Sequence, residues 1–167
     1  MDLLDRLLEH DRWTTNQVLA ICRTLSPQQL QQPFDVGHGT MDETLRHMIA
    51  NIQIWTDLMA GGPVRSREAL HRADMAEMSV LYESIYADFA ALARRVQAEG
   101  RLDEVYYDTL RNPPEPYTLG GTIVHVISHD MQHRVELLHM LGKLGAPEVP
   151  EGDVLYWEVV TGEQQER

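Results

Sequence analysis

The sequence predicts an all-α fold, a four-helix bundle with one long crossover connection. In four long segments the apolar residues recur every three or four positions, which is the spacing of one helical face. Capping residues, glycines and prolines bound these segments, and each is long enough for a helix of about 30 Å. The chain of 167 residues is 43% hydrophobic, which is enough for one full core. We predict a single domain over residues 1–160 and a disordered tail over 161–167.

The first long helix is predicted over residues 2–25. One face of it carries the apolar residues Leu3, Leu7, Val18, Ile21 and Leu25. Ser26 and Pro27 match an N-cap followed by proline at the first helical position, so a short helical turn is predicted as far as Gln32. Residues 33–39 are predicted to form a loop.

The second and third long helices are predicted from a capping pattern and two apolar faces. Thr40 precedes Glu43 by three residues, as in a capping box, and the Gly-Gly-Pro sequence at 61–63 ends the second helix. Its apolar face comprises Met41, Leu45, Met48, Ile49, Ile52, Trp55 and Met59. The third helix is predicted over residues 74–97, and residues 66–73 fit one further helical turn. Its apolar face comprises Met78, Leu81, Ile85, Phe89, Leu92 and Val96.

Residues 102–118 are the least helical part of the chain. They include the sequence Asn-Pro-Pro-Glu-Pro at 112–116, so an ordered connection is predicted, with a short strand at 105–107 and a small hairpin. A connection of this length also permits a parallel pair of helices in the bundle.

The fourth long helix is predicted from Thr118 or Thr122 to Leu141. Glycines 142 and 145 end it, and Pro147 and Pro150 prevent its continuation. Its core-facing residues are predicted to be Ile123, Ile127, Val135, Leu138 and Leu141. Beyond it, two adjacent aromatic residues, Tyr156 and Trp157, are predicted to pack against the bundle.

The composition limits the classes of partner and compartment. The chain carries 14 basic and 26 acidic residues and no Lys/Arg cluster to neutralise phosphates, so nucleic acid is not an expected partner. Cys22 is the one cysteine, which excludes an internal disulfide and suits a reducing cytoplasm. The chain starts without an apolar signal region, and no apolar run approaches the about 20 residues of a membrane span. We therefore expect a cytoplasmic protein with no membrane partner.

Three histidines of the fourth long helix form the strongest functional signal. His125, His129 and His133 recur at every fourth residue, so they lie on one stripe beside the apolar face. Two imidazoles one turn apart can bind the same metal ion, as in helical zinc sites. We predict that His129 and His133 are metal ligands. His125 is a further ligand, a hydrogen-bonding partner of a ligand, or a residue that lines the site.

A third ligand is expected from a facing helix, and His47 of the second long helix is the best candidate. It lies off the main apolar face, on a second stripe with Ile54 and Leu58, a pattern typical of a helix buried on two sides. The alternative is a lone histidine that is partly exposed or hydrogen bonded. Three other histidines are expected in loops, at the surface or on another side of the fourth helix, and are not proposed as site residues: His38, His71 and His139.

Polar residues also interrupt the apolar face of the first helix. His10, Thr14 and Gln17 share that face, which indicates either a wet cavity beside it or polar groups that satisfy one another. On the fourth helix, Asp130 and Glu136 are placed to accept the second N–H of a histidine ligand, unless they remain solvated.

Four segments, in order along the chain, match motifs of one known family. They are Trp-Thr-Thr-Asn at 13–16, Thr-Leu-Arg-His-Met-Ile at 44–49 with Trp55 and Gly61, the stretch 118–134 with its H-x-x-x-H-R sequence, and the closing segment 141–156. In these motifs the chain resembles the DinB superfamily of metalloenzymes, also called the DinB/YfiT-like family. One departure is Arg134-Val135, where relatives often have Arg-Gly.

The resemblance implies a four-helix bundle, often dimeric, in which three histidines hold a divalent metal ion, typically zinc or nickel. The matching positions in this chain are His47, His129 and His133. Characterised relatives include mycothiol-dependent isomerases and bacillithiol S-transferases. The implied cosubstrate is therefore a low-molecular-weight thiol, which the metal holds as its thiolate, and the implied substrate is a small electrophile. A homodimer is expected.

Two kinds of function stay open at this point. In the first, the chain is a thiol S-transferase or, alternatively, a metal-dependent hydrolase, in which His125 and His10 are catalytic residues and Gln17 lines the pocket. In the second, it is a non-catalytic, metal-stabilised binding protein of a stress response. The fourth ligand separates them, because a catalytic site keeps an open position for water or substrate whereas a structural site is closed by a protein side chain.

Overall fold

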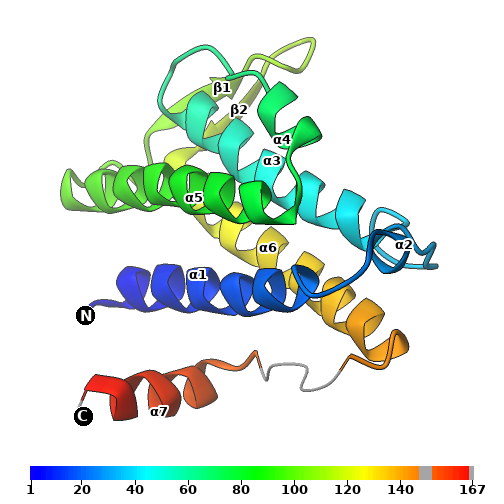
Figure 1. Ribbon diagram of the computed structural model, residues 1–167. Helices are drawn as coiled ribbons and strands as arrows, with labels where there is room; N and C mark the ends of the chain where they lie inside the picture. The colour runs from blue at the N-terminus through cyan, green and yellow to red at the C-terminus, as the bar shows by residue number, and fades with distance from the viewer. Residues whose placement is uncertain (147–151, 166–167) are drawn as a thin grey trace.

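The computed structural model describes residues 1–146 and 152–165, with the side chains of 163–165 left out. Four long helices make up most of it (Figure 1): α1 (Leu3–Cys22), α3 (Met41–Met59), α5 (Met75–Ala98) and α6 (Leu119–Lys143). α1 and α3 each contact both α5 and α6, so the core lies among the four. The predicted mainly helical fold is confirmed, since about 68% of the chain is helical.

Shorter elements connect the long helices. α2 (Pro27–Leu30) and α4 (Glu68–Arg72) lie before and after α3, and β1 (Val105–Asp108) pairs with β2 (Glu115–Thr118) before α6. The two strands are antiparallel, with Val105 opposite Thr118, which confirms the predicted small hairpin.

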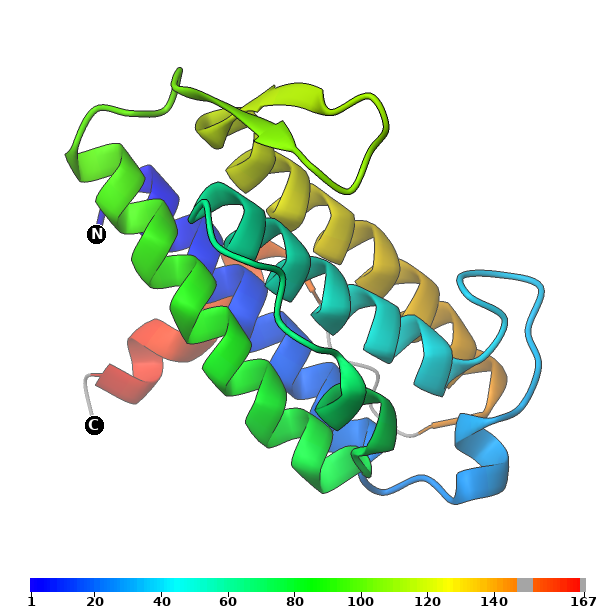
Figure 2. The same ribbon diagram turned by 90° about the horizontal axis from the view of Figure 1, so that it is seen from above.

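The helix directions place the crossover connection at residues 60–74. α1 and α6 run in one direction and α3 and α5 in the other (Figures 1 and 2). α3 and α5 are consecutive long helices, so the chain must return along the bundle between them, through α4. Arg46 of α3 fixes this return, because its guanidinium donates hydrogen bonds to the carbonyls of Leu70 and Ala73. The crossover predicted at residues 102–118 is therefore wrong, because this longer connection, 99–118, folds back as the hairpin and joins the antiparallel α5 and α6.

Side-chain caps set the starts of the long helices. Thr40 Oγ1 accepts from the N–H of Glu43 at 3.1 Å, and Asp74 and Glu77 form a complete capping box at the start of α5. Thr118 Oγ1 accepts from the N–H of Gly121 at 3.1 Å, so α6 begins at Leu119, the earlier of the two predicted starts.

The apolar faces of α3 and α5 are predicted well, and that of α1 only in its second half, where Val18 is buried and Ile21 and Leu25 pack against the core. Leu3 and Leu7 are 74% and 38% exposed, and on α6 the predicted core residue Val135 is 62% exposed. The buried residues of α1 are Leu8, His10, Asp11, Thr14, Thr15, Val18, Leu19 and Cys22. Polar Asp11 and Thr15 occupy the buried face because Arg134 of α6 pairs with them inside the core, so apolar spacing alone selects the wrong stripe. Burial raises the pKa of the Cys22 thiol to about 12, as suits a core residue.

The C-terminal segment folds as α7 (Val154–Gln165), a helix that the sequence pattern does not predict. Trp157 is buried, with its ring edge-on to that of His10 at 5.8 Å, so the predicted packing of this segment against α1 is present. Residues 161–165 belong to this helix rather than to a disordered tail, and residues 166–167 lie outside the described chain, as do Pro147 and Pro150. No helix in the described ranges has the length and apolarity needed to cross a membrane.

Candidate metal centre

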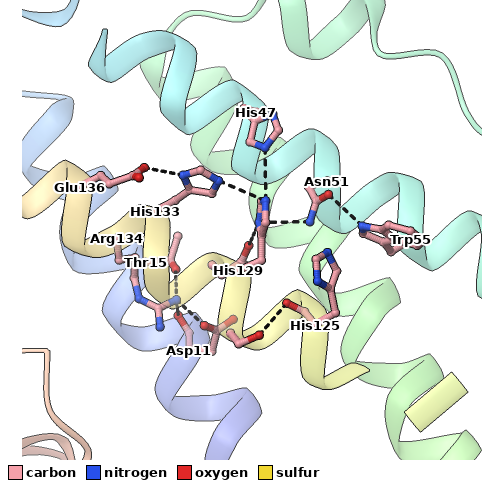
Figure 3. Close-up of polar contacts among 12 residues, drawn as sticks. Asp11, Thr15, His47, Asn51, Trp55, His125, His129, His133, Arg134 and Glu136 are labelled. Atoms are coloured by element: carbon pink, nitrogen blue, oxygen red, sulfur yellow. Dashed lines mark hydrogen bonds and ion pairs between the residues drawn. The ribbon is translucent and has the colours of Figure 1, made fainter. Parts of the chain in front are cut away.

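The three predicted ligands lie together between α3 and α6 (Figure 3). Nε2 of His129 is 3.3 Å from Nε2 of His47 and 3.1 Å from Nε2 of His133. Zinc–nitrogen bonds are about 2.0–2.1 Å long, so two nitrogens on one tetrahedral ion lie about 3.3–3.4 Å apart. The two distances from Nε2 of His129 are therefore close to those between ligands of one divalent cation.

The protonation states of these rings also suit a cation. Burial, with smaller contributions from the neighbouring histidines, lowers the pKa of both His47 and His129 to about 4. Both rings are therefore neutral at pH 7, and each has one nitrogen lone pair that a metal can accept.

Glu136 orients His133. The Nδ1–H of the buried His133 ring donates to Glu136 Oε2 at 2.6 Å, which leaves the lone pair on Nε2, the atom that faces His129. A carboxylate that accepts the second N–H of a ligand is typical of protein metal sites. Glu136 is therefore the acceptor of a ligand's second N–H that the sequence suggests. Asp130 does not accept such an N–H, because its Oδ1 lies 3.8 Å from Nδ1 of His129.

A fourth histidine, which the sequence does not indicate as a site residue, also lies next to the cluster of His47, His129 and His133. His38, in the loop before α3, stacks on His47 with ring centroids 3.7 Å apart. One nitrogen from each of His38, His47 and His133 lies within 4.8 Å of the other two. The signal that could have found it is local, since His38 stands between Gly37 and Gly39, which both have positive φ.

Asn51 links the cluster to Trp55. The Asn51 amide nitrogen lies 3.2 Å from Nδ1 of His129, and its Oδ1 accepts from the Trp55 indole N–H at 2.9 Å. With this amide orientation Nδ1 of His129 is an acceptor, so a neutral ring carries its proton on Nε2 and shares it with the adjacent histidines. A cation at Nε2 would move that proton to Nδ1, and the Asn51 amide would have to turn, which leaves Trp55 without its acceptor.

We therefore predict that Asn51→Asp strengthens metal binding by about 10-fold or more. A carboxylate at position 51 accepts from both His129 Nδ1–H and the Trp55 indole, and so removes the conflict between two donors. Competition with a chelator of known affinity measures the change. Ser128→Asp is the control, since it adds the same charge on exposed α6 surface next to His129 without this contact. Equal or weaker binding by Asn51→Asp than by Ser128→Asp would refute the proposed hydrogen-bond change.

The other predicted site residues fall in two different places. His125 is one turn before His129, and its ring lies 5.4 Å from the rings of both His129 and Trp55. His10 lies elsewhere, on α1, where its Nε2 is 2.9 Å from the Gly152 carbonyl oxygen. Among the residues that the structure describes, the contacts of His10 do not include the histidine cluster.

A cavity of about 380 Å³ adjoins the cluster on the hairpin side of the molecule. Trp55 and Tyr117 form aromatic walls, with ring centroids 5.8 Å apart, and His125 and Arg111 add polar groups. His125 lines the cavity and its ring lies 5.4 Å from that of His129, so a small molecule in this space would contact His125, one helical turn from the predicted ligand His129.

A helical protein in which histidines of two facing helices converge on one point is a candidate metal-binding bundle. The chain belongs to the DinB family, whose model matches residues 1–166. Among curated proteins, a search finds no match.

Proposed function

We propose that this DinB-family protein is a metal-dependent enzyme that transfers a low-molecular-weight thiol to a small electrophile. The observation that carries the proposal is the juxtaposition of convergent histidine nitrogens with an aromatic-walled cavity. Catalytic metal sites in proteins combine three side-chain ligands with an adjacent open space for the reactant.

In this proposal His47, His129 and His133 hold the divalent ion, zinc or nickel, and Glu136 keeps Nε2 of His133 free for it. A bound divalent ion would lower the pKa of a thiol and keep its sulfur as the nucleophilic thiolate.

His125 is the proposed proton acceptor. Burial lowers the pKa of its ring, so the imidazole is neutral at pH 7 and can take the proton that the incoming thiol gives up. The sulfur then forms a bond to the electrophilic carbon, and the electron pair of the broken bond departs with the leaving group. Arg111 is placed at the cavity to pair with a carboxylate of the thiol, and Trp55 and Tyr117 exclude water. His10 has no step here, because its ring contacts Gly152 and Trp157.

One observation favours the non-catalytic alternative. His38 supplies a further nitrogen near His47 and His133, and four protein ligands would make a closed structural site. A hydrolase would use the same centre with water in place of the thiol, so metal-dependent loss of the electrophile without any thiol would distinguish it from the other two functions.

The test is to incubate metal-loaded protein with a model electrophile and, in turn, cysteine, bacillithiol, mycothiol and glutathione. We expect metal-dependent loss of at least one thiol. His125→Ala should slow that loss about 100-fold at unchanged metal content, because it removes the proton acceptor.

His139→Ala is the matched control for the loss of one imidazole, since His139 is exposed on the same helix. It should react like the wild type. If no thiol is consumed faster with metal than without it, the protein is not an S-transferase for this panel. Metal-dependent loss of the electrophile alone would then indicate the hydrolase, and no reaction at all would indicate the binding function.

A further inference from the structure

We propose that His38 is a fourth, displaceable nitrogen ligand, which closes the metal centre until a small ligand takes its place. This inference rests on the proposed metal centre and adds to it a residue outside the predicted ligand set.

The first support is position. The His38 ring is 3.7 Å from that of His47 and 5.4 Å from that of His133, and it lies near-parallel to His47, with 27° between the planes. Three nitrogens, one from each of these residues, already lie within 4.8 Å of one another. The His38 ring therefore lies close enough to His47 and His133 to offer a nitrogen to the same cation.

The second support is the loop, which is built to hold His38 there. Its ends are joined by the Phe34 N–H, which donates to the Gly39 carbonyl at 2.7 Å, and the His38 N–H donates to Thr44 Oγ1 at 3.1 Å. Gly37 and Gly39 have φ of 63° and 88°, which other L-residues rarely adopt.

Gly37 is also needed for space. A Cβ at position 37 would lie 2.8 Å from Thr44 Oγ1 and 3.1 Å from Glu136 Oε2. The missing side chain lets the loop backbone approach the carboxylate that orients His133. The loop and the histidine cluster are therefore packed against each other.

The third support is that an incoming small ligand can displace His38 more easily than His47 or His133. His47 and His133 are on helices and partly or fully buried, and the carboxylate of Glu136 holds His133 in place. The His38 side chain is exposed, and among the described residues its ring makes ring contacts but no hydrogen bond. It is the ligand that can leave at least cost. When a thiol replaces it, the sulfur takes the position of the nitrogen, and the thiol proton passes to His125, the proposed acceptor.

The test uses Co²⁺ as a spectroscopic probe in wild-type protein, His38→Ala and the control His71→Ala, which removes an exposed histidine of α4. Chelator competition gives the Co²⁺ affinity, the visible absorption reports the coordination of Co²⁺, and titration with cysteine reports a thiolate–cobalt charge-transfer band. Gly39→Ala is a second variant. It keeps the His38 ring but strains the loop, and its Cβ meets nothing nearer than Glu43 Oε2 at 3.8 Å.

We expect His38→Ala to bind Co²⁺ about 10-fold more weakly, with a changed visible spectrum, and to need less cysteine to reach the charge-transfer band. Wild type and His38→Ala should end with the same cysteine-bound spectrum, His71→Ala should match wild type, and Gly39→Ala should change in the direction of His38→Ala. If His38→Ala has the affinity, spectrum and cysteine titration of the wild type, His38 is no ligand. If wild type binds no Co²⁺, the metal centre itself fails and this inference fails with it.

Discussion

Replacement of His133 with alanine is expected to abolish stoichiometric metal binding, with a loss of affinity of more than about 100-fold, since outer-sphere partners alone contribute about 10–100-fold. His133 belongs to both possible ligand sets. It lies 3.1 Å from Nε2 of His129, and it also belongs to the group formed with His38 and His47. Its loss in addition leaves the Glu136 carboxylate without the ring that it orients.

The measurement is metal content by elemental analysis, on protein purified without an affinity column that supplies nickel. His129→Ala is the informative comparison. It leaves three nitrogens, of His38, His47 and His133, within 4.8 Å of one another, so we expect a smaller loss than for His133→Ala. His139→Ala should retain full occupancy. Full occupancy in His133→Ala would place the metal away from this cluster.

The elements of the fold follow from local rules and could be predicted. Thr40 caps α3 as its capping pattern predicts, the helices predicted to start near Asp74 and Thr118 do begin directly after these residues, and the hairpin forms where apolar helical spacing fails. The position of the crossover could not be predicted in the same way. It depends on which helices run parallel, and a connection of fifteen residues between α3 and α5 could equally have formed a simple antiparallel turn.

The residues of the candidate site also differ in whether local sequence rules could predict them. His129 and His133 share a helix face because four residues make about one turn, so the spacing alone brings them together. His47 could be inferred because its helix has two apolar stripes, and α3 does contact both α5 and α6. His38 could not be inferred from periodicity, because a loop has none. Its place is set by two glycine φ values, by the hydrogen bond from its N–H to Thr44 Oγ1, and by the close approach of Gly37 to Glu136 of α6.

Arg134 is expected to contribute most among the polar residues to stability, and Arg134→Met should lower the free energy of unfolding by about 3–5 kcal/mol. The guanidinium is 5% exposed, forms an ion pair with the fully buried Asp11 and donates to Thr15 Oγ1 at 3.2 Å. Methionine keeps the apolar length of the side chain, so the loss measures mainly the uncompensated charge of Asp11. Denaturant unfolding followed by circular dichroism measures it.

Asp130 lies in the same buried polar group as Asp11 and Arg134, and its protonation affects the net charge of that group. Burial, together with the negative charge of Asp11, raises the pKa of Asp130, and both of its oxygens lack a hydrogen-bond partner in the described part of the chain. Burial and the charge of Asp11 therefore both favour the protonated form of Asp130, and the ion pair of Arg134 is with Asp11. Burial already raises the pKa of Asp11, and Arg134 is the main group that opposes this effect, so the pKa of Asp11 should rise further in Arg134→Met. The deficit in stability should then be smallest in acid, where Asp11 is protonated in both states, and should grow as the pH rises.

The double variant Asp11→Leu, Arg134→Met separates the ion pair from the packing around it. Replacement of a buried ion pair by apolar residues of similar volume is often neutral or stabilising, whereas removal of one partner is costly. We therefore expect the double variant to regain most of the stability that Arg134→Met loses, and to lose the pH dependence of the deficit. If both variants are equally unstable, the cost comes from packing at position 134. Because Arg134 follows His133 directly on α6, a double variant that is stable but binds metal more weakly would show that the ion pair also positions the ligand helix.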